Sequence, residues 1–437
     1  MEEPAPEPIV MKPSPRWIIL DRFIHRSSRD ADARGDGTAS ATSYTCTGGP
    51  IRASLRVAAA AVFPAVSRLH LHWPDRLDFR GRLSEPWLIA AHAHSILFRA
   101  TVPLGDPVPC NYTHVFPDDL FVYSAFSSPP ALHRLPACFV GGASTPHEDI
   151  YFKPYRRRQQ RAMLDEEMGI LCHGGDGEFT VADFTDFGPG GELCLLRHRS
   201  GSQKKIETEW MVKSVRFPQG PSGHYWVTDA IVPVDGRFLC WVDNYQGILV
   251  VDVLLAGDES SPGPVQLRYI PLPDEASQSE RLDPDGDCPD PARCVRATAG
   301  GMIKLVCIDA CPMRRRSDFT VRSWTLYDIN QGRWCKGDDM GAAEFWGLYS
   351  GQLSLPRVKP EYPLVSLVHP DATCFLLKEA HGTYWMIEVD MRNKVLKSSA
   401  RYMREEEEEE ECSAKRVRRN FFDGHSFIPS EISTYLS

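Results

Sequence analysis

The stretch "AIVPVDGRFLCWVDNYQGILVVDVLLAGDESSPGPVQLRYIPLP", residues 230–273, decides the fold. Short apolar runs rich in Val, Ile, Leu and aromatic residues alternate with turns that contain Asp, Asn, Gly or Pro. Runs of this length and composition, bounded by such turns, are typical of β-strands. The stretch therefore predicts a small antiparallel sheet of three or four strands.

The same pattern recurs along the chain. Four further stretches follow it, namely residues 87–136, 169–218, 300–337 and 362–402. Each has an apolar strand, a polar turn, a second apolar strand and a more polar outer strand. Because a small sheet cannot bury both of its faces alone, successive units must cover one another.

Stacking of the units around a common axis gives a β-propeller, in which a blade usually takes ~40–50 residues. We therefore predict an all-β fold, a β-propeller-like ring of about six antiparallel sheets with long loops. The segments "PRWIILDRF", "IRASLRVAAA" and "SRLHLHW" near the N-terminus are expected to supply a sixth unit or the strand that closes the ring. Tandem β-sandwiches are the alternative, although they would leave open sheet edges to protect.

The predicted domain organisation has three parts: a Pro/Glu-rich tail at 1–15, the propeller-like domain at 16–402 and a charged, flexible C-terminal tail at 403–437. Within the domain, the turn-rich segments 27–50 and 274–293 are expected to be loops. The best helix candidate is "YRRRQQRAMLDEEMG", residues 155–169.

Composition restricts the class of protein. The hydrophobic content of 42% and the charged content of 24% are ordinary for a globular chain. The formal net charge of -9 argues against a general nucleic-acid binder, which needs a basic surface. No apolar run approaches the ~20 residues that cross a bilayer, and the acidic, Pro-rich start resembles neither a secretory leader nor a transit peptide. We expect a protein of the cytoplasm, the nucleus or both.

Several segments together resemble a known family. They include "SPRWIILDRFIHR", "LIAAHAHSILFRATV", "RFLCWVDNYQGILVVDV", "LRYIPLP", "IKLVCIDACP" and "WMIEVDMRNKVLKS". In this combination the chain, from about Pro15 to Tyr402, resembles the plant family called domain of unknown function 1618, which is expanded in grasses. Its strand pattern is also distantly similar to the F-box-associated propellers of plants, although no F-box helix pattern precedes the repeats. The resemblance implies no catalytic residues, because the family has no agreed ones.

The histidines and cysteines that could bind a metal are better interpreted as packed side chains of the fold. His92 and His94 in "AAHAHSI" share one face of a strand and could chelate a metal, but two imidazoles on a half-buried strand are the favoured interpretation. Thirteen cysteines are scattered without a C-x-x-C pair, which indicates reduced, packed thiols. The nearest approach to a zinc pattern is the irregular set Cys288, Cys294, Cys307 and Cys311. No metal and no cofactor are expected.

Catalytic signatures are missing from the sequence. It contains no phosphate-binding loop, no G-x-G-x-x-G, no H-E-x-x-H and no G-x-S-x-G turn. Asp243 and Asp390 follow apolar strands directly, and we expect their carboxylates to accept backbone N–H bonds in turns.

Two basic clusters are candidate contact sites. The first, Arg156, Arg157, Arg158 and Arg161, could touch an anion or an acidic partner. The second follows seven consecutive glutamates, has the composition of a nuclear-import signal and consists of Lys415, Arg416, Arg418 and Arg419. A solvated surface is the alternative for the first cluster. For the second, the alternative is a disordered or frayed helical charge block whose basic run arises by accident.

These observations favour a non-enzymatic protein-interaction scaffold built on a propeller-like domain. The expected partner is another protein, with no membrane and no nucleic acid. The alternative is a small-molecule binder or a hydrolase-type enzyme that uses the central channel of the ring. That alternative predicts a polar cluster that converges from equivalent positions in several blades, whereas the sequence repeats no acid or His at one blade position.

Overall fold

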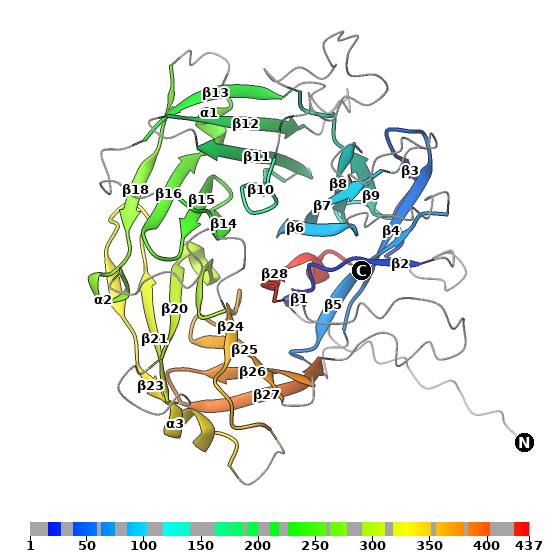
Figure 1. The fold of residues 1–437 in the computed structure, drawn as a ribbon. Coiled ribbons are helices and arrows are strands. Elements are labelled where there is room, and N and C mark those ends of the chain that lie inside the picture. Colours follow the sequence, from blue (N-terminus) through cyan, green and yellow to red (C-terminus); the bar gives the residue numbers. More distant parts are fainter. Residues whose placement is uncertain are drawn as a thin grey trace, which may run out of the picture.

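Six small, mostly antiparallel sheets stand around a central axis in the computed structural model of the chain (Figure 1). The structure describes residues 16–27, 38–58, 63–74, 85–102, 117–139, 161, 163–175, 177–186, 190–199, 210–217, 226–258, 263–277, 291–310, 318–350, 355–379, 383–402 and 424–436. We number the sheets as blades 1 to 6 in chain order. The predicted all-β, propeller-like ring is confirmed, and the tandem sandwiches are not formed.

Blades 2 to 4 follow the chain from the channel outward, apart from the last strand of blade 3. Blade 2 consists of β6 (Trp87–His92), β7 (Ser95–Thr101), β8 (Asp118–Ser124) and β9 (Ala131–Arg134). Blade 3 consists of β10 (Met168–His173), β11 (Glu178–Asp186), β12 (Gly191–His198), β13 (Met211–Arg216) and β17 (Val265–Gln266). Blade 4 consists of β14 (Ala230–Val234), β15 (Phe238–Asp243), β16 (Gly247–Asp252) and β18 (Arg268–Pro271).

Blades 5 and 6 also follow the chain from the channel outward. Short helices connect some of the strands. Blade 5 consists of β19 (Arg293–Ala297), β20 (Ile303–Ala310), β21 (Phe319–Leu326), β22 (Trp334–Lys336) and β23 (Met340–Gly341). Blade 6 consists of β24 (Glu361–Val365), β25 (Ala372–Lys378), β26 (Tyr384–Asp390) and β27 (Val395–Tyr402). The helices are α1 (Val253–Ala256), α2 (Asp274–Ser277), α3 (Ala342–Gly347) and the 3₁₀ turns at Ala299–Gly301 and Ile432–Thr434.

Blade 1 is assembled from both ends of the chain. Its inner strand is β28 (Ile428–Ser430), which pairs antiparallel with β1 (Ile18–Leu20). Outward from β1 lie β5 (Val66–His72), β4 (Pro50–Arg56) and β3 (Ser43–Tyr44), while β2 (His25–Ser27) also pairs with β5. The expected N-terminal unit is therefore present, and a C-terminal strand completes it.

Each pair of neighbouring blades encloses one hydrophobic core. In β21, Phe319 and Val321 pack into the core shared with blade 6, while Trp324 and Leu326 pack into the core shared with blade 4. Five cores lie between consecutive blades, and a sixth joins blade 6 to blade 1 through residues such as Leu376 and Ile19. The six cores close the ring, which explains why the repeat needs neighbours on both sides.

Three sequence expectations need correction. The helix expected at 155–169 is wrong for its described part, because Met168 and Gly169 begin strand β10. The loop expected at 27–50 contains the short strand β3 and the fully buried side chain of Ser40. Residues 424–436 were assigned to the flexible tail, but β28 makes them part of blade 1.

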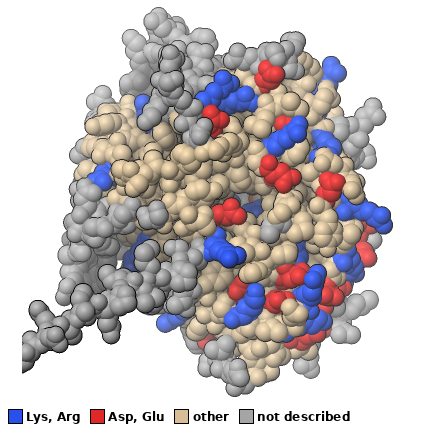
Figure 2. Space-filling model, turned by 180° about the vertical axis from the view of Figure 1, so that it is seen from behind, with Lys and Arg blue, Asp and Glu red and all other residues tan. Residues whose placement is uncertain are grey.

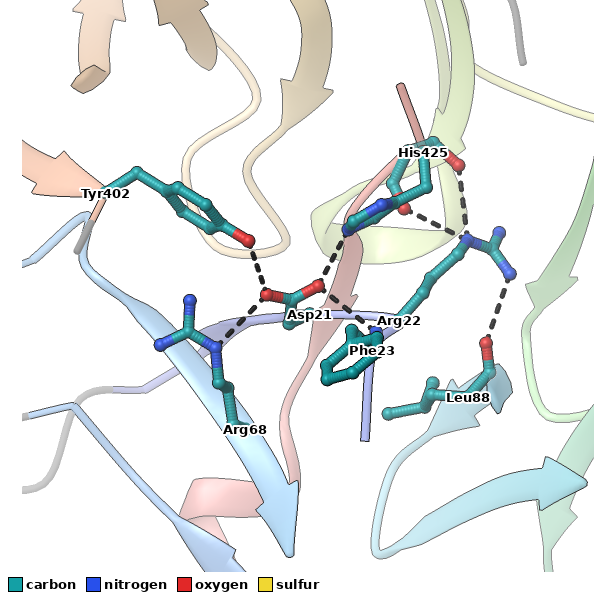
Figure 3. A network of polar contacts seen from close by, with 8 residues as sticks. Asp21, Arg22, Phe23, Arg68, Leu88, Tyr402 and His425 are labelled. Atoms are coloured by element: carbon teal, nitrogen blue, oxygen red, sulfur yellow. Dashed lines mark hydrogen bonds and ion pairs between the residues drawn. The ribbon is translucent and has the colours of Figure 1, made fainter. Parts of the chain in front are cut away.

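A buried carboxylate joins the two ends of the chain where the ring closes (Figure 3). Asp21, which is 1% exposed, accepts bonds from Tyr402 Oη at 2.7 Å and from Arg68 Nε at 3.2 Å. His425 Nε2 lies 2.7 Å from its other oxygen, which also accepts the N–H of Phe23 at 3.2 Å. These partners come from blade 6, from β5 and from the segment before β28, so we call them the closure network.

Charge pairing makes the closure network stabilising despite its burial. Burial by itself raises the pKa of Asp21, but His425, Arg68 and Tyr402 lower it to about 2. The Arg68 guanidinium also lies 5.2 Å from the centre of the Tyr402 ring. A buried carboxylate with this many donors is ionised and resists removal of any partner.

We expect Asp21→Asn to lower the free energy of unfolding by about 3 kcal/mol, because donors of the closure network would lose their anionic acceptor. Asp309→Asn is the control, since its ion pair with Arg322 is partly exposed and should contribute less than ~1 kcal/mol. Urea unfolding at pH 7 measures both. Equal losses in the two variants would contradict the role of Asp21.

Acid should weaken the wild-type protein at the same site. The pKa of Asp21 is about 2 in the folded state and 3.8 without its environment, so the folded state binds the proton less readily than the unfolded chain. The stabilisation, about 2 kcal/mol, is complete above pH 4 and is lost as the pH falls toward 2. Urea midpoints of the wild type and Asp21→Asn should therefore converge between pH 5 and pH 2. A constant difference over this range would contradict the assignment.

Candidate functional site

A cavity of about 260 Å³ occupies the channel between the inner strands. Residues of β6, β10, β14, β19 and β28 line it, together with Leu367 after β24. Edge strands tolerate proline because one row of their backbone groups has no partner strand. Pro233, Pro363 and Pro429 all lie on inner strands, which is consistent with this rule.

Two arginines lie half-buried in the cavity wall. The Arg22 guanidinium donates through Nε to Ser426 O at 3.0 Å and through Nη1 to Leu88 O and Ile89 O at 3.3 and 3.0 Å. Arg296 donates through Nη1 to Val295 O at 3.0 Å. Neither forms an ion pair with any carboxylate in the described part of the chain. Backbone carbonyls therefore hold both guanidinium groups.

Acidic side chains also line the cavity, and several have fixed positions. Asp165 lies 2.9 Å from Arg99 Nη2, and burial raises its pKa to about 6 although Arg99 opposes the shift. Asp229 accepts the N–H of Asn244 at 2.7 Å. Glu166 is exposed just before the inner strand β10. Asp235 and Glu431 are exposed just after the inner strands β14 and β28. Polar groups from several blades thus converge on one channel.

Apolar side chains separate these polar groups. Ile89, Ile170, Ile231 and Val232 line the cavity, together with the small residues Ala90 and Ala297. Mixed walls with a few placed polar groups are typical of small-molecule sites. The channel can therefore accept a compact ligand that has both polar and apolar surfaces.

The two candidate metal ligands are used within the protein. His92 Nδ1 accepts the N–H of Cys172 at 2.8 Å, while His94 Nδ1 contacts the hydroxyls of Ser95 and Ser124 at 2.9 and 3.1 Å. Burial lowers the pKa of both imidazoles to about 4. Within the described ranges, no group of three or more His, Cys, Asp or Glu side chains is arranged to hold a metal ion.

The turn prediction for the two aspartates is confirmed. Asp243 Oδ1 accepts the N–H of Tyr245 at 2.8 Å, and Asp390 Oδ1 accepts the N–H of Asn393 at 2.9 Å. Of the cysteines in the irregular set, Cys294 and Cys307 are buried on β19 and β20. Cys288 and Cys311 lie outside the described residues.

The basic clusters fall mostly outside the described part of the chain. Arg156, Arg157 and Arg158 lie there, as do Lys415, Arg416, Arg418 and Arg419. Arg161 is described, and its guanidinium lies 2.5 Å from Glu192 and 3.4 Å from the buried Asp183. Its charge is therefore used inside blade 3.

Sequence reasoning missed Arg22, Arg296 and the acidic residues of the channel. They lie near strand ends or in loops of four blades, and no spacing along the chain connects them. The one available signal was the pair Asp21-Arg22 directly after the apolar run "WIIL", since charges beside a buried strand need partners.

The comparison with protein families gives a partial match. A family model described as a protein of unknown function, DUF1618, matches residues 241–374, which extend from β15 to β25. The match agrees with the resemblance over the middle of the chain. The plant and grass association and the link to F-box proteins stay predictions. No curated protein matches the sequence.

Solved structures give distant likenesses only. An ulvan lyase of a polysaccharide lyase family has 7% identity and a TM-score of 0.33, with 88% of this chain and 83% of that chain covered. The Dos1 propeller has 6% identity and a TM-score of 0.32, with 72% and 60% covered. The lectin of Aleuria aurantia has 10% identity and a TM-score of 0.30, with 84% and 95% covered. At these scores the likenesses carry no argument about function.

We expect His92→Ala to lower the free energy of unfolding by about 2 kcal/mol, because the N–H of Cys172 would lose its acceptor in a buried setting. The zinc content of the purified protein should stay unchanged. His369→Ala, at an exposed position after β24, is the matched control and should change neither quantity. Loss of bound zinc in His92→Ala would contradict the structural role.

Proposed function

We propose that this protein is a non-enzymatic interaction module that binds another protein through one end of its ring. We call this end the hairpin face. It carries the turns that follow each inner strand, such as the β6–β7 turn at Ala93 and the β14–β15 turn at Asp235. The proposal rests on the distribution of exposed apolar side chains.

Exposed large apolar side chains concentrate on the hairpin face. Among the described residues, seven such side chains are exposed, and five belong to turns or segments at this end of the strands: Phe126, Leu255, Tyr327, Val395 and Tyr435. Tyr44 lies on the outer strand of blade 1, and Leu164 precedes the inner strand of blade 3. Such side chains mark contact surfaces when they gather on one face.

Two of the five form a contiguous aromatic patch beside the channel. The rings of Phe126 and Tyr435 lie 5.3 and 5.6 Å from the ring of His94. Phe126 is 47% exposed and Tyr435 is 40% exposed. Aromatic side chains that are partly anchored and partly exposed supply much of the binding energy at protein interfaces. This aromatic patch is therefore the proposed centre of the contact.

Charge supports a protein partner over a nucleic acid. On the face drawn in Figure 2, Lys and Arg side chains are interspersed with Asp and Glu. Ion pairs between described side chains include Lys336 with Glu275 at 2.6 Å and Lys394 with Glu344 at 2.7 Å. A nucleic-acid site needs a basic surface.

Among the described residues, no helix is both long and apolar enough to span a membrane.

The non-enzymatic part of the proposal draws on the channel. Among its lining residues, His92 and Ser430 have the chemistry of a base and a nucleophile, and each accepts a backbone N–H bond, from Cys172 and Ile432 respectively. Two lining carboxylates, which also have the chemistry of a base, have partners as well: Asp165 pairs with Arg99, and Asp229 accepts the N–H of Asn244. Nuclear import through Lys415, Arg416, Arg418 and Arg419 is a separate proposal about location, compatible with this function.

We expect the double substitution Phe126→Ser and Tyr435→Ser to remove partner proteins that co-purify with the tagged full-length chain. At least a tenfold loss is expected, because aromatic anchors contribute about 2 kcal/mol or more each. Leu164→Ser is the control, since Leu164 is equally exposed but lies at the opposite end of the strands. Quantitative mass spectrometry of affinity-captured complexes measures all three proteins. Partners that survive the double substitution, or are lost equally in the control, would contradict the proposal.

A further inference from the structure

The two arginines that line the channel are held by backbone carbonyls and form no ion pair with a carboxylate in the described part of the chain. Arg22 has its Nε and Nη1 groups fixed by the carbonyls of Ser426, Leu88 and Ile89. No described residue accepts a bond from its Nη2, and Arg22 lines the cavity. The guanidinium is thus held in one orientation with a donor still to satisfy.

A second arginine, Arg296, lines the same cavity as Arg22. Burial and the charge of Arg296 together lower the pKa of Arg22 to about 10. Two like charges in a poorly solvated channel repel each other, and here neither has a carboxylate within ion-pairing distance in the described part of the chain. Such an arrangement costs stability, and a bound anion would remove that cost.

Arg293 lies on the same strand as Arg296, β19, and it has the contacts of a purely structural arginine. Arg293 is 5% exposed and donates to Asn244 O at 2.8 Å and to Ala276 O at 2.9 Å. Its guanidinium also lies 4.4 Å from the centre of the Tyr245 ring. Arg293 ties blade 5 to blade 4, whereas Arg296 makes one bond, to the carbonyl of its own neighbour.

The rest of the lining restricts the kind of anion. Asp165 and Glu166 are near enough to act on the charge of Arg22, and Asp235 and Glu431 also line the cavity. A dianion such as phosphate would be repelled by these carboxylates more strongly than a monoanion. Hydroxyl or amino groups on the ligand would satisfy them, because carboxylates accept hydrogen bonds.

We propose that the central channel binds a small organic acid that carries hydroxyl or amino groups, with its carboxylate between Arg22 and Arg296. A planar carboxylate matches the donor geometry of guanidinium groups. The cavity of about 260 Å³ lies just below the ~300–1,000 Å³ of drug-sized sites, which indicates a ligand of monosaccharide or amino-acid size. This inference goes beyond the proposed protein contact and does not depend on it.

Galacturonate and galactose are suitable probes, because they differ only in the carboxylate. At about 20 mM, galacturonate should raise the Tm of the wild-type protein more than galactose does, as expected for a ligand of the folded state. The shift should vanish in Arg296→Gln. It should persist in Arg392→Gln, which removes an equal charge from a side chain that is 66% exposed.

The stability of the unliganded variants gives a test that needs no ligand. The Tm of Arg296→Gln should be at least equal to that of the wild type and at most about 1–2 °C higher, because the substitution removes the repulsion from Arg22. Arg293→Gln should lower the Tm, because it breaks bonds between blades. The inference is overturned if Arg296→Gln destabilises the protein as Arg293→Gln does. It is also overturned if galacturonate acts no more strongly than galactose, or if its effect survives in Arg296→Gln.

Discussion

The burial of both faces of every blade against its neighbours is the constraint on which this structure depends. A sheet of four strands in this chain has no polar side to turn to water: Leu239 and Trp241 of β15 face blade 3, while Cys240 and Val242 face blade 5. Such sheets are stable only in a closed ring, where every sheet has a neighbouring sheet against each of its two faces. Closure therefore requires blade 1 to meet blade 6. The chain achieves this by pairing its C-terminal strand with its N-terminal one and by placing Asp21 among donors from both ends.

Closure also creates the functional features. The inner strands cannot meet at the axis, so the ring leaves a channel whose walls are strand edges and the side chains near strand ends. Arg22 follows Asp21 directly, which means that the residue completing the closure network and the residue lining the channel are neighbours (Figure 3). The β6–β7 turn and the β8–β9 turn bring His94 and Phe126 to one face, and the segment after β28 adds Tyr435. Ring closure thus positions both the channel and the aromatic patch.

Local pattern was enough to predict the blades, and it was not enough to predict what joins them. The apolar runs and turn residues of 230–273, and the turn chemistry of Asp243, identified strands and hairpins correctly, because these are properties of neighbouring residues. The strand β28 was assigned to the tail, since three residues that include Pro429 have little strand signal of their own. Their pairing with β1 is a contact across some 400 residues. The channel residues were missed for the same reason: Arg22 and Arg296 line one cavity only after the ring has closed.

The most direct test of this account is the stability of a chain that ends at Tyr402. If the ring is closed by residues 424–436, this truncated chain should lose the cooperative thermal transition of the full-length protein, as followed by near-ultraviolet circular dichroism. Its aromatic core signals should also weaken in blades 1 and 6 first. A truncated chain that melts cooperatively at the full-length Tm would show that closure does not hold the fold together.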